Sequence, residues 1–197
     1  KKEKKVTEDL TCNPISIYNK TKIIAERVLL SYSNKIKIHC IRPATVCGFS
    51  PRMRIDVSVN MFIYQALQKG KITVFGGSQI RPNININDLT NIYIHFINNP
   101  KIKTGNYNAG FENLKIIDIA KLVQKYIPCK IEVLKNFNDQ RSYRQNSDKL
   151  IKTGFKRKYS VDDAIKDIKK RYLQNKLKID EKCITVKWMK KIGLKNG

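Results

Sequence analysis

Apolar side chains recur at helical spacing along four stretches of the chain. Within each stretch they lie three or four residues apart, which places them on one face of an α-helix. The four stripes are Ala25, Val28, Leu29 and Tyr32; Val59, Phe62, Ile63, Ala66 and Leu67; Ile116, Ala120, Val123 and Ile127; and Val161, Ile165, Ile168 and Tyr172. Ser160 and Asp163 have the spacing of a capping box, which predicts where the last of these helices begins.

Extended segments alternate with these helices. Over residues 35–40, lysine and histidine alternate with isoleucine and cysteine, which predicts a strand that ends at Pro43. Further extended segments are expected at residues 71–79, 81–89, 105–110 and 130–134. The second of these leads into another helix, with Asp88 near its start. Alternating helices and strands predict an α/β fold.

A tyrosine and a lysine lie one helical turn apart on the first predicted helix. Tyr18 and Lys22 have i, i+4 spacing, which places both side chains on one face. A phenol with a pKa of ~10 is a poor base at neutral pH, and a nearby ammonium favours its ionised form. Such a pair suits hydride chemistry at a carbinol, where a base takes the hydroxyl proton. In a lysine-rich chain the spacing also arises by chance, so the alternative is an ordinary surface helix.

Arginines near turns and strand ends suggest an anionic ligand. Residues 41–48 end a strand, which is where a parallel sheet binds its ligands. Arg81 follows a Gly-Gly turn, and Arg141 and Arg144 lie in a polar loop. Arginine side chains hold phosphates well because they make charge-assisted, bidentate hydrogen bonds.

The chain is strongly basic. Lys and Arg outnumber Asp and Glu by 40 to 16 among 197 residues, which gives a formal net charge of +24. Such a charge is typical of proteins that bind nucleic acids or anionic membranes. The lysines are scattered, however, and no run of interleaved aromatics and arginines occurs. We therefore favour a generic basic surface, with a nucleic-acid-binding module as the alternative.

The cysteines and histidines do not predict a metal site. The five cysteines are widely spaced without a CxxC pair, and the two histidines do not cluster. An odd number of dispersed cysteines is typical of reduced thiols, which favours the cytoplasm. The sequence contains neither a long apolar run nor the apolar part of a signal peptide, so no membrane association is expected.

Six segments together resemble a known family. In order along residues 6–172 they are TEDLTCNPISIYNKTKIIAE, IRPATVCG, SPRMRIDVSVN, GGSQIRPNININDL, GNYNAG and DQRSYRQNSDKLIKTGF. Their order and spacing resemble the NAD-dependent nucleotide-sugar epimerase/dehydratase branch of the extended short-chain dehydrogenase/reductase family. The resemblance implies the C-terminal part of a Rossmann-like NAD(P)-binding fold plus a smaller α/β substrate-binding region.

The resemblance also implies an activity. Family members interconvert a nucleotide-activated sugar through a transient keto intermediate, as a UDP-sugar 4-epimerase does. NAD is the implied cofactor, with NADP as the alternative, the nucleotide sugar is the implied partner, and the family allows a homodimer.

Several residues correspond to the family's catalytic and cofactor-binding positions. Tyr18 corresponds to the acid/base, and Lys22 to the residue that favours the phenolate and holds the nicotinamide ribose. Pro43 and Val46 correspond to contacts with the nicotinamide, although Pro43 would equally serve only to end a strand.

Other residues correspond to the family's substrate contacts. Asn60 resembles the residue that contacts the substrate pyrophosphate, and Arg81 resembles the phosphate clamp. Asp139 and Arg141 fall where the family contacts the nucleotide ribose and phosphates, whereas Arg144 is expected to be a solvated loop residue.

The chain departs from the family pattern at several positions. Cys47 stands where the family usually has tyrosine and Asn85 where it has histidine, and we expect both to be structural, as we do for Asp88. The nine glycines contain no Gly-x-x-Gly-x-x-Gly turn, which in the family lets the backbone approach the dinucleotide pyrophosphate. The family's catalytic serine or threonine also lies farther upstream of the tyrosine than this chain extends. We therefore expect the chain to be the C-terminal part of a longer enzyme.

The expected domain organisation is discontinuous. Residues 1–50 and 84–104 are expected to form the end of the Rossmann-like domain, and residues 51–83 and 105–175 the nucleotide-sugar domain. Residues 176–197 are expected to form a basic tail. Three apolar residues of this tail are candidates for docking on the core: Val186, Trp188 and Met189.

Three hypotheses are open at this point. The first is a working epimerase/dehydratase whose N-terminal part is missing from this sequence. The second is a truncated product that is folded but inactive, or active only beside a separate N-terminal chain. The third is a basic nucleic-acid-binding module. Within the first hypothesis, the nucleotide (UDP, dTDP or GDP) and the reaction (4-epimerisation, 4,6-dehydration or decarboxylation) are also open.

Overall fold

The structure is a computed structural model that describes residues 5–134 and 142–193. Its helices are α1 (Ile17–Ser31), α2 (Ser58–Lys69), α3 (Ile86–Asn98), α4 (Ile116–Tyr126), α5 (Asp148–Ile151), α6 (Val161–Leu173), the 3-10 turn η1 (Glu181–Cys183) and α7 (Thr185–Lys191). Its strands are β1 (His39–Pro43), β2 (Thr45–Cys47), β3 (Lys71–Phe75), β4 (Ile80–Asn85), β5 (Gly105–Ala109), β6 (Glu112–Lys115) and β7 (Lys130–Leu134).

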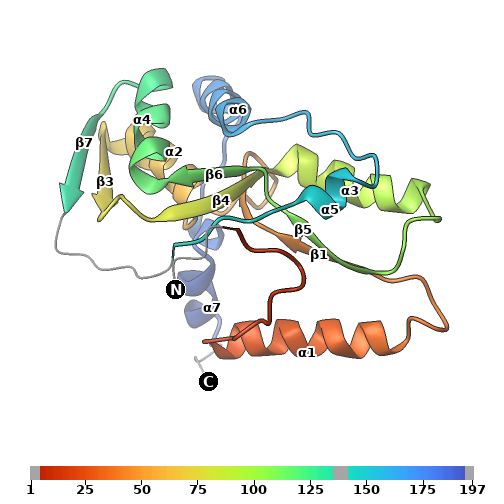
Figure 1. The fold of residues 1–197 in the computed structure, drawn as a ribbon. Helices are drawn as coiled ribbons and strands as arrows, with labels where there is room; N and C mark the ends of the chain where they lie inside the picture. Colours follow the sequence, from red (N-terminus) through yellow and green to blue (C-terminus); the bar gives the residue numbers. More distant parts are fainter. Residues whose placement is uncertain (1–4, 135–141, 194–197) are drawn as a thin grey trace.

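Among the described residues the strands pair in three small sheets (Figure 1). β1 runs parallel to β5, β3 runs parallel to β7, and β4 lies between a parallel β2 and an antiparallel β6. Helices alternating with parallel strands confirm the predicted α/β class. The first strand begins later than its sequence pattern predicts. Its pairing with β5 starts at His39 opposite Gly105, and Ile36 lies in the turn that follows α1.

Two hydrophobic cores lie beside each other. In the larger core the apolar stripes of α2, α4 and α6 pack together and against β3, and Phe62, Ile119 and Ile165 are fully buried. In the smaller core, Ile92 of α3 packs with Tyr107 of β5 and their neighbours. Figure 1 shows α2, α4 and β3 of the larger core at the left and α3 of the smaller core at the right. The predicted stripes of α2, α4 and α6 are thus confirmed as buried faces.

The position of β5 bears on the expected domain division. Residues 105–109 are expected in the nucleotide-sugar domain, but β5 pairs with β1, and its Tyr107 and Ala109 belong to the smaller core. Strand pairing and shared burial hold elements together, so we group β5 with the first region. The division of the chain into two regions otherwise stays a prediction.

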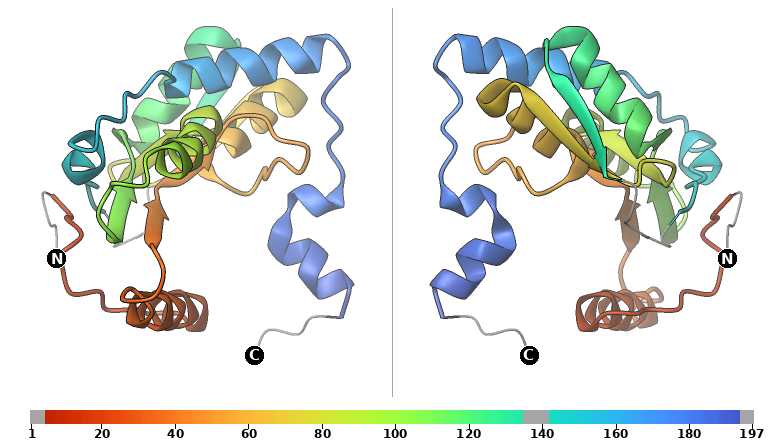
Figure 2. Two further views of the ribbon diagram at one scale, coloured as in Figure 1. Left: turned by 90° about the vertical axis from the view of Figure 1, so that its right-hand side faces the viewer. Right: turned by 90° about the vertical axis from the view of Figure 1, so that its left-hand side faces the viewer.

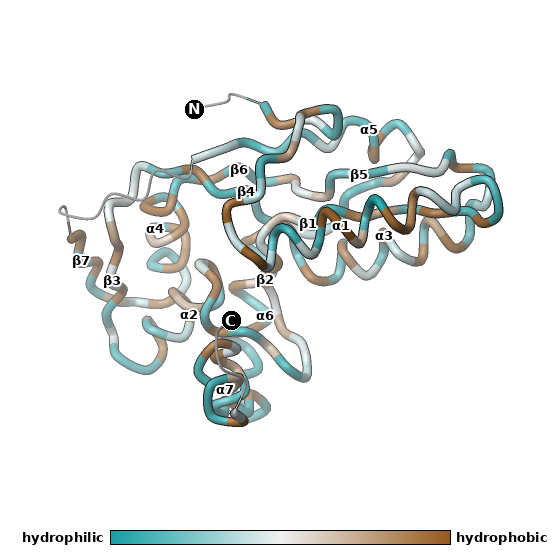
Figure 3. The backbone as a smooth tube through the Cα atoms, turned by 90° about the horizontal axis from the view of Figure 1, so that it is seen from below, coloured by the Kyte–Doolittle hydropathy of each residue, from teal (hydrophilic) through white to brown (hydrophobic). Residues whose placement is uncertain are grey.

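Helix α1 lies apart from both cores (Figures 1 and 2). Every residue of this helix is at least partly exposed, and its predicted stripe, including Val28 and Leu29, faces solvent rather than a core. Figure 3 shows apolar residues alternating with polar ones along it. The helix is held by Glu26, whose carboxylate pairs with Arg42 of β1 over 2.6 Å and accepts a hydrogen bond from Asn106 of β5 over 2.9 Å.

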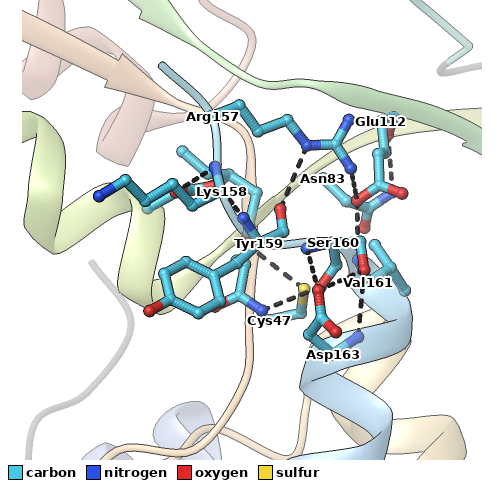
Figure 4. Close-up of polar contacts among 12 residues, drawn as sticks. Cys47, Asn83, Glu112, Arg157, Lys158, Tyr159, Ser160, Val161 and Asp163 are labelled. Carbon is cyan, nitrogen blue, oxygen red and sulfur yellow. Dashed lines mark hydrogen bonds and ion pairs between the residues drawn. The ribbon is translucent and has the colours of Figure 1, made fainter. Parts of the chain in front are cut away.

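The N-terminus of α6 is held by the predicted capping box (Figure 4). The Ser160 hydroxyl accepts a hydrogen bond from the backbone N–H of Asp163 over 3.2 Å, and the Asp163 carboxylate accepts one from the Ser160 N–H over 2.8 Å. Glu112 of β6 adds a second anchor, since its carboxylate accepts from the Val161 N–H and pairs with Arg157. These contacts attach α6 to the sheet that carries β4 and β6.

Asp88 is a linking group, as expected. Its side chain is fully buried in the first turn of α3. Its carboxylate accepts hydrogen bonds from the backbone N–H groups of Lys158 and Tyr159 over 3.1 and 3.0 Å. Asp88 therefore joins α3 to the segment that leads into α6.

The end of the chain packs on the larger core. Cys183 is buried, and Leu177, Ile179 and Ile184 pack beside it. Two of the residues predicted to dock are exposed instead: Val186 and Met189. They lie on α7, beyond the segment that contacts the core, so the docking residues are earlier in the chain than predicted.

Candidate active site

A pocket of about 550 Å³ lies at the carboxyl end of β1 and along β2. Its walls include Tyr18 of α1, Pro43 of β1, Val46 of β2 and Asn60 of α2. These four residues are far apart in the sequence, and all four are among the predicted site residues. The fold therefore brings half of that set to one place, at the sheet edge where parallel strands bind ligands.

Tyr18 and Lys22 share one face of α1, as their spacing predicts. The helix is capped by Ser16, whose hydroxyl accepts a hydrogen bond from the Asn19 N–H over 3.2 Å. This cap places Tyr18 in the first turn, at the pocket, with 68% of its surface exposed. The Lys22 ammonium lies 5.3 Å from the centroid of the Tyr18 ring. A cation at this distance from an aromatic ring is attracted to it, so the two side chains form a pair.

The side-chain amide of Asn60 forms hydrogen bonds with the backbone of the loop between β2 and α2. Its amide oxygen accepts from the Gly48 N–H over 3.0 Å, and its amide nitrogen donates to the Arg54 carbonyl over 2.9 Å. Asn60 is buried and ties the two ends of the loop between β2 and α2 together. Its predicted contact with the substrate pyrophosphate stays a prediction.

Arg81 lines a second pocket instead of the first. This pocket has a volume of about 300 Å³, and its walls also include Phe75 and Gln79. Thr45 and Val57 line both pockets, so the two are adjacent. The guanidinium of Arg81 donates to the Ile80 carbonyl over 3.1 Å. The predicted residues are therefore divided between two neighbouring pockets.

Two predicted substrate residues, Asp139 and Arg141, lie outside the described residues. Arg144 is described and is exposed, in agreement with its expected place as a solvated loop residue. Its carbonyl accepts a hydrogen bond from the Val6 N–H over 2.7 Å.

The two departures from the family pattern have structural places. Cys47 is fully buried, and its thiol donates to the Ile84 carbonyl. Burial raises the pKa of the Cys47 thiol to about 12, so it stays protonated. Asn85 caps α3 by accepting from the Asn87 N–H, and it donates to the Ser160 carbonyl over 2.9 Å. Neither side chain lines the pockets.

The sequence reasoning missed several wall residues of the first pocket. Arg52, Arg54 and Tyr143 all line it. The hydrogen bond that Arg54 donates to the Asp56 carboxylate raises the pKa of Arg54. Burial lowers this pKa, and the nearby negative charge of Asp56 raises it further. The sequence feature that could have identified them is the pair Arg52 and Arg54 in a short loop directly after a strand. Loops that follow parallel strands are where such a sheet binds ligands.

Comparison with known proteins assigns the family. The sequence profile of the NAD dependent epimerase/dehydratase family matches residues 1–110. The chain belongs to this family. Among curated members of the epimerase/dehydratase family, an uncharacterized UDP-glucose epimerase YtcB of Bacillus subtilis (strain 168) is 30% identical over 127 residues, covering 62% of this chain and 40% of the relative.

Solved structures of epimerases and dehydratases share the fold. The UDP-glucuronic acid 4-epimerase of Bacillus cereus, in complex with UDP-glucuronic acid and NAD, is 26% identical, with a TM-score of 0.73 over 88% of this chain and 58% of that chain. The dTDP-glucose 4,6-dehydratase of Bacillus anthracis str. Ames, in complex with NAD, is 20% identical, with a TM-score of 0.74 over 89% of this chain and 58% of that one. The chain thus spans less than two thirds of these relatives. The likeness confirms the predicted Rossmann-like type of α/β fold.

The described residues offer neither a metal site nor a membrane-spanning helix. No three His, Cys, Asp or Glu side chains there lie close enough to hold a metal ion. None of the described helices is both long and apolar enough to cross a membrane.

Proposed function

We propose that this chain carries the acid–base pair and the substrate pockets of an NAD-dependent enzyme that epimerises or dehydrates a nucleotide-activated sugar. The observation that carries the proposal is the position of Tyr18. Its phenol lines the same pocket as Pro43 and Val46, with the Lys22 ammonium 5.3 Å from its ring centroid. A proton acceptor, a cation and an apolar wall thus meet at one edge of the sheet.

In this arrangement Tyr18 takes the proton of a sugar hydroxyl and later returns it. The Lys22 ammonium, 5.3 Å from the centroid of the Tyr18 ring, brings a positive charge and three hydrogen-bond donors close to it. The exposed position of Tyr18 leaves its side chain accessible to a ligand that enters the pocket.

The pocket residues fit the nicotinamide end of NAD, with NADP as the alternative. Pro43 and Val46 of the pocket wall offer apolar surface to a flat ring. Lys22, which pairs with the Tyr18 ring on the same face of α1, has three donors that suit the ribose hydroxyls. When bound, NAD would supply reversible hydride transfer at the sugar carbon. Relatives of this chain have been solved with NAD.

The two adjacent pockets suit the two halves of a nucleotide sugar. Both have volumes typical of small-molecule sites, about 550 and about 300 Å³. We assign the sugar to the pocket with Tyr18 and the nucleotide to the pocket with Arg81, Phe75 and Gln79. The shared wall residues Thr45 and Val57 lie between them, where the diphosphate joins the two halves. UDP-sugar epimerases among the relatives support this choice of substrate class.

A titration of the chain with UDP in a calorimeter tests the proposal. Arg81→Ala should weaken UDP binding by about 1–3 kcal/mol, because it removes a charge-assisted hydrogen bond. Arg144→Ala is the matched control, since it removes the same charge from an exposed position. All titrations use one salt concentration, because a chain of +24 attracts any polyphosphate. Equal losses for both variants would mean diffuse charge attraction, and the assignment of Arg81 would be wrong.

A further inference from the structure

The loop between β2 and α2 is tied to the end of the chain. Residues 177–191, which we call the C-terminal strap, run from the end of α6 through α7, and Figure 2 shows them as the blue segment that descends from α6. Cys183 of the strap is buried in the larger core. The Ile55 N–H donates to the Cys183 carbonyl over 2.9 Å. The strap and the pocket loop are therefore in direct backbone contact.

Asp56 connects the strap to an arginine of the first pocket. One carboxylate oxygen accepts from the backbone N–H of Thr185, the first residue of α7, over 3.2 Å. The other accepts from Nε of Arg54 over 2.8 Å. The N–H groups of a first helical turn lack partners within the helix, so this carboxylate satisfies one of them. Asp56 thus holds α7 on one side and Arg54 on the other.

Arg54 lies in the wall of the pocket with Tyr18, and its position is fixed at two points. Asn60 holds its carbonyl and Asp56 holds its Nε. Among the described residues neither Nη nitrogen makes a hydrogen bond, and the side chain is about half exposed, at 49%. A guanidinium has five N–H donors in a rigid fork, so four donors of Arg54 stay available to a ligand.

We propose that Arg54 binds an anionic oxygen group of the nucleotide sugar, and that the C-terminal strap positions Arg54 through Asp56. The inference rests on the proposed function and adds a second arginine to it. Arg81 lines the nucleotide pocket, whereas Arg54 lies on the Tyr18 side of the wall formed by Thr45 and Val57. The diphosphate and an acidic sugar both offer such oxygens, and the test separates them.

The strap is tested with a pair of variants at one residue. Thr185→Pro removes the N–H that holds Asp56, and proline is well tolerated at the first position of a helix. Thr185→Val is the matched control, because it keeps the N–H and the branched shape and removes only the hydroxyl. The emission of Trp188, the single tryptophan and a residue of α7, reports whether the strap stays docked in both variants.

Binding of UDP, UDP-glucose and UDP-glucuronic acid is measured by calorimetry at one salt concentration. Arg54→Gln should weaken binding about tenfold, as expected for a lost hydrogen bond to a charged group. Thr185→Pro should weaken it about threefold or more, and Thr185→Val should not. In the Arg54→Gln background Thr185→Pro should have no further effect, because the strap acts through Arg54. Arg27→Gln, on the exposed surface of α1, controls for the loss of one positive charge.

Each outcome supports or refutes one part of the proposal. An equal loss for all three ligands in Arg54→Gln assigns Arg54 to the diphosphate, and a loss confined to UDP-glucuronic acid assigns it to a sugar carboxylate. If Arg54→Gln and Arg27→Gln behave alike, Arg54 does not bind the ligand. If Thr185→Pro weakens binding further in the Arg54→Gln background, or matches Thr185→Val, the strap does not position Arg54. A wild-type chain that binds none of the ligands overturns the proposed function and this inference together.

Discussion

Replacing Asn60 with alanine removes three hydrogen bonds that close the pocket loop. The amide oxygen of Asn60 accepts from Gly48 N–H over 3.0 Å, and its nitrogen donates to the Arg54 and Gly48 carbonyls over 2.9 and 3.4 Å. The side chain is 3% exposed, so water does not readily replace these bonds. A buried polar group left without a partner costs about 1–3 kcal/mol. With Gly48 N–H and the Arg54 carbonyl both left unpaired, we expect the free energy of unfolding to fall by about 2–4 kcal/mol.

The measurement is urea denaturation followed by far-ultraviolet circular dichroism. Asn19→Ala is the matched control, because Asn19 is exposed on α1 and the same substitution there should change the free energy of unfolding by less than about 0.5 kcal/mol. If Asn60→Ala changed the free energy of unfolding as little as this control, the three bonds would not close the loop, and our account of the pocket wall would be refuted.

Three further predictions address catalysis, cofactor binding and pH. Tyr18→Phe should lower turnover in the proposed nucleotide-sugar reaction on the order of 10²-fold by removing the proton acceptor while keeping the ring, and unchanged turnover would contradict its assignment. The chain as given should bind NAD weakly in a calorimeter, because it lacks a Gly-x-x-Gly-x-x-Gly turn, and micromolar affinity would show that other residues hold the pyrophosphate. Hydrogen bonds from Ser160 lower the pKa of Asp163, so Asp163 stabilises the fold above its unfolded-state pKa of about 4 and this contribution is lost as pH falls below that value. Denaturation of wild type and Asp163→Asn at several pH values should therefore show a stability difference at pH 7 that shrinks toward pH 3.

The buried faces of the helices in the larger core could be predicted from the sequence. Phe62, Val123 and Ile165 lie on stripes of 3.6-residue period, and all three are buried. The stripe of α1 had the same period, but Val28 and Leu29 are exposed. Periodicity identifies the apolar face of a helix and does not say what that face packs against, so the same pattern led to opposite outcomes.

The candidate site was predictable where its residues follow strand ends. Pro43 and Val46 come from the first strand end and meet Tyr18 in one pocket, as the fold type requires. The contact of Asp56 with Thr185 had no such signal, because it joins residues 129 positions apart through a backbone N–H. Any residue type except proline provides that donor, so no residue identity marks it in a sequence.

The isolation of α1 has a kinetic consequence for Tyr18. Segments with few buried contacts open independently of the rest of a protein, and helices of about 12–15 residues are marginal by themselves. The amide protons of α1 should therefore exchange with solvent through local openings, well before those of the buried α2. Tyr18 lines the pocket only in molecules whose α1 is docked. Turnover in the proposed reaction should therefore scale with the fraction of time that α1 is docked. The Glu26–Arg42 ion pair contributes to that fraction, so the presentation of Tyr18, the proposed acid/base, should depend on ionic strength even when the chemistry does not.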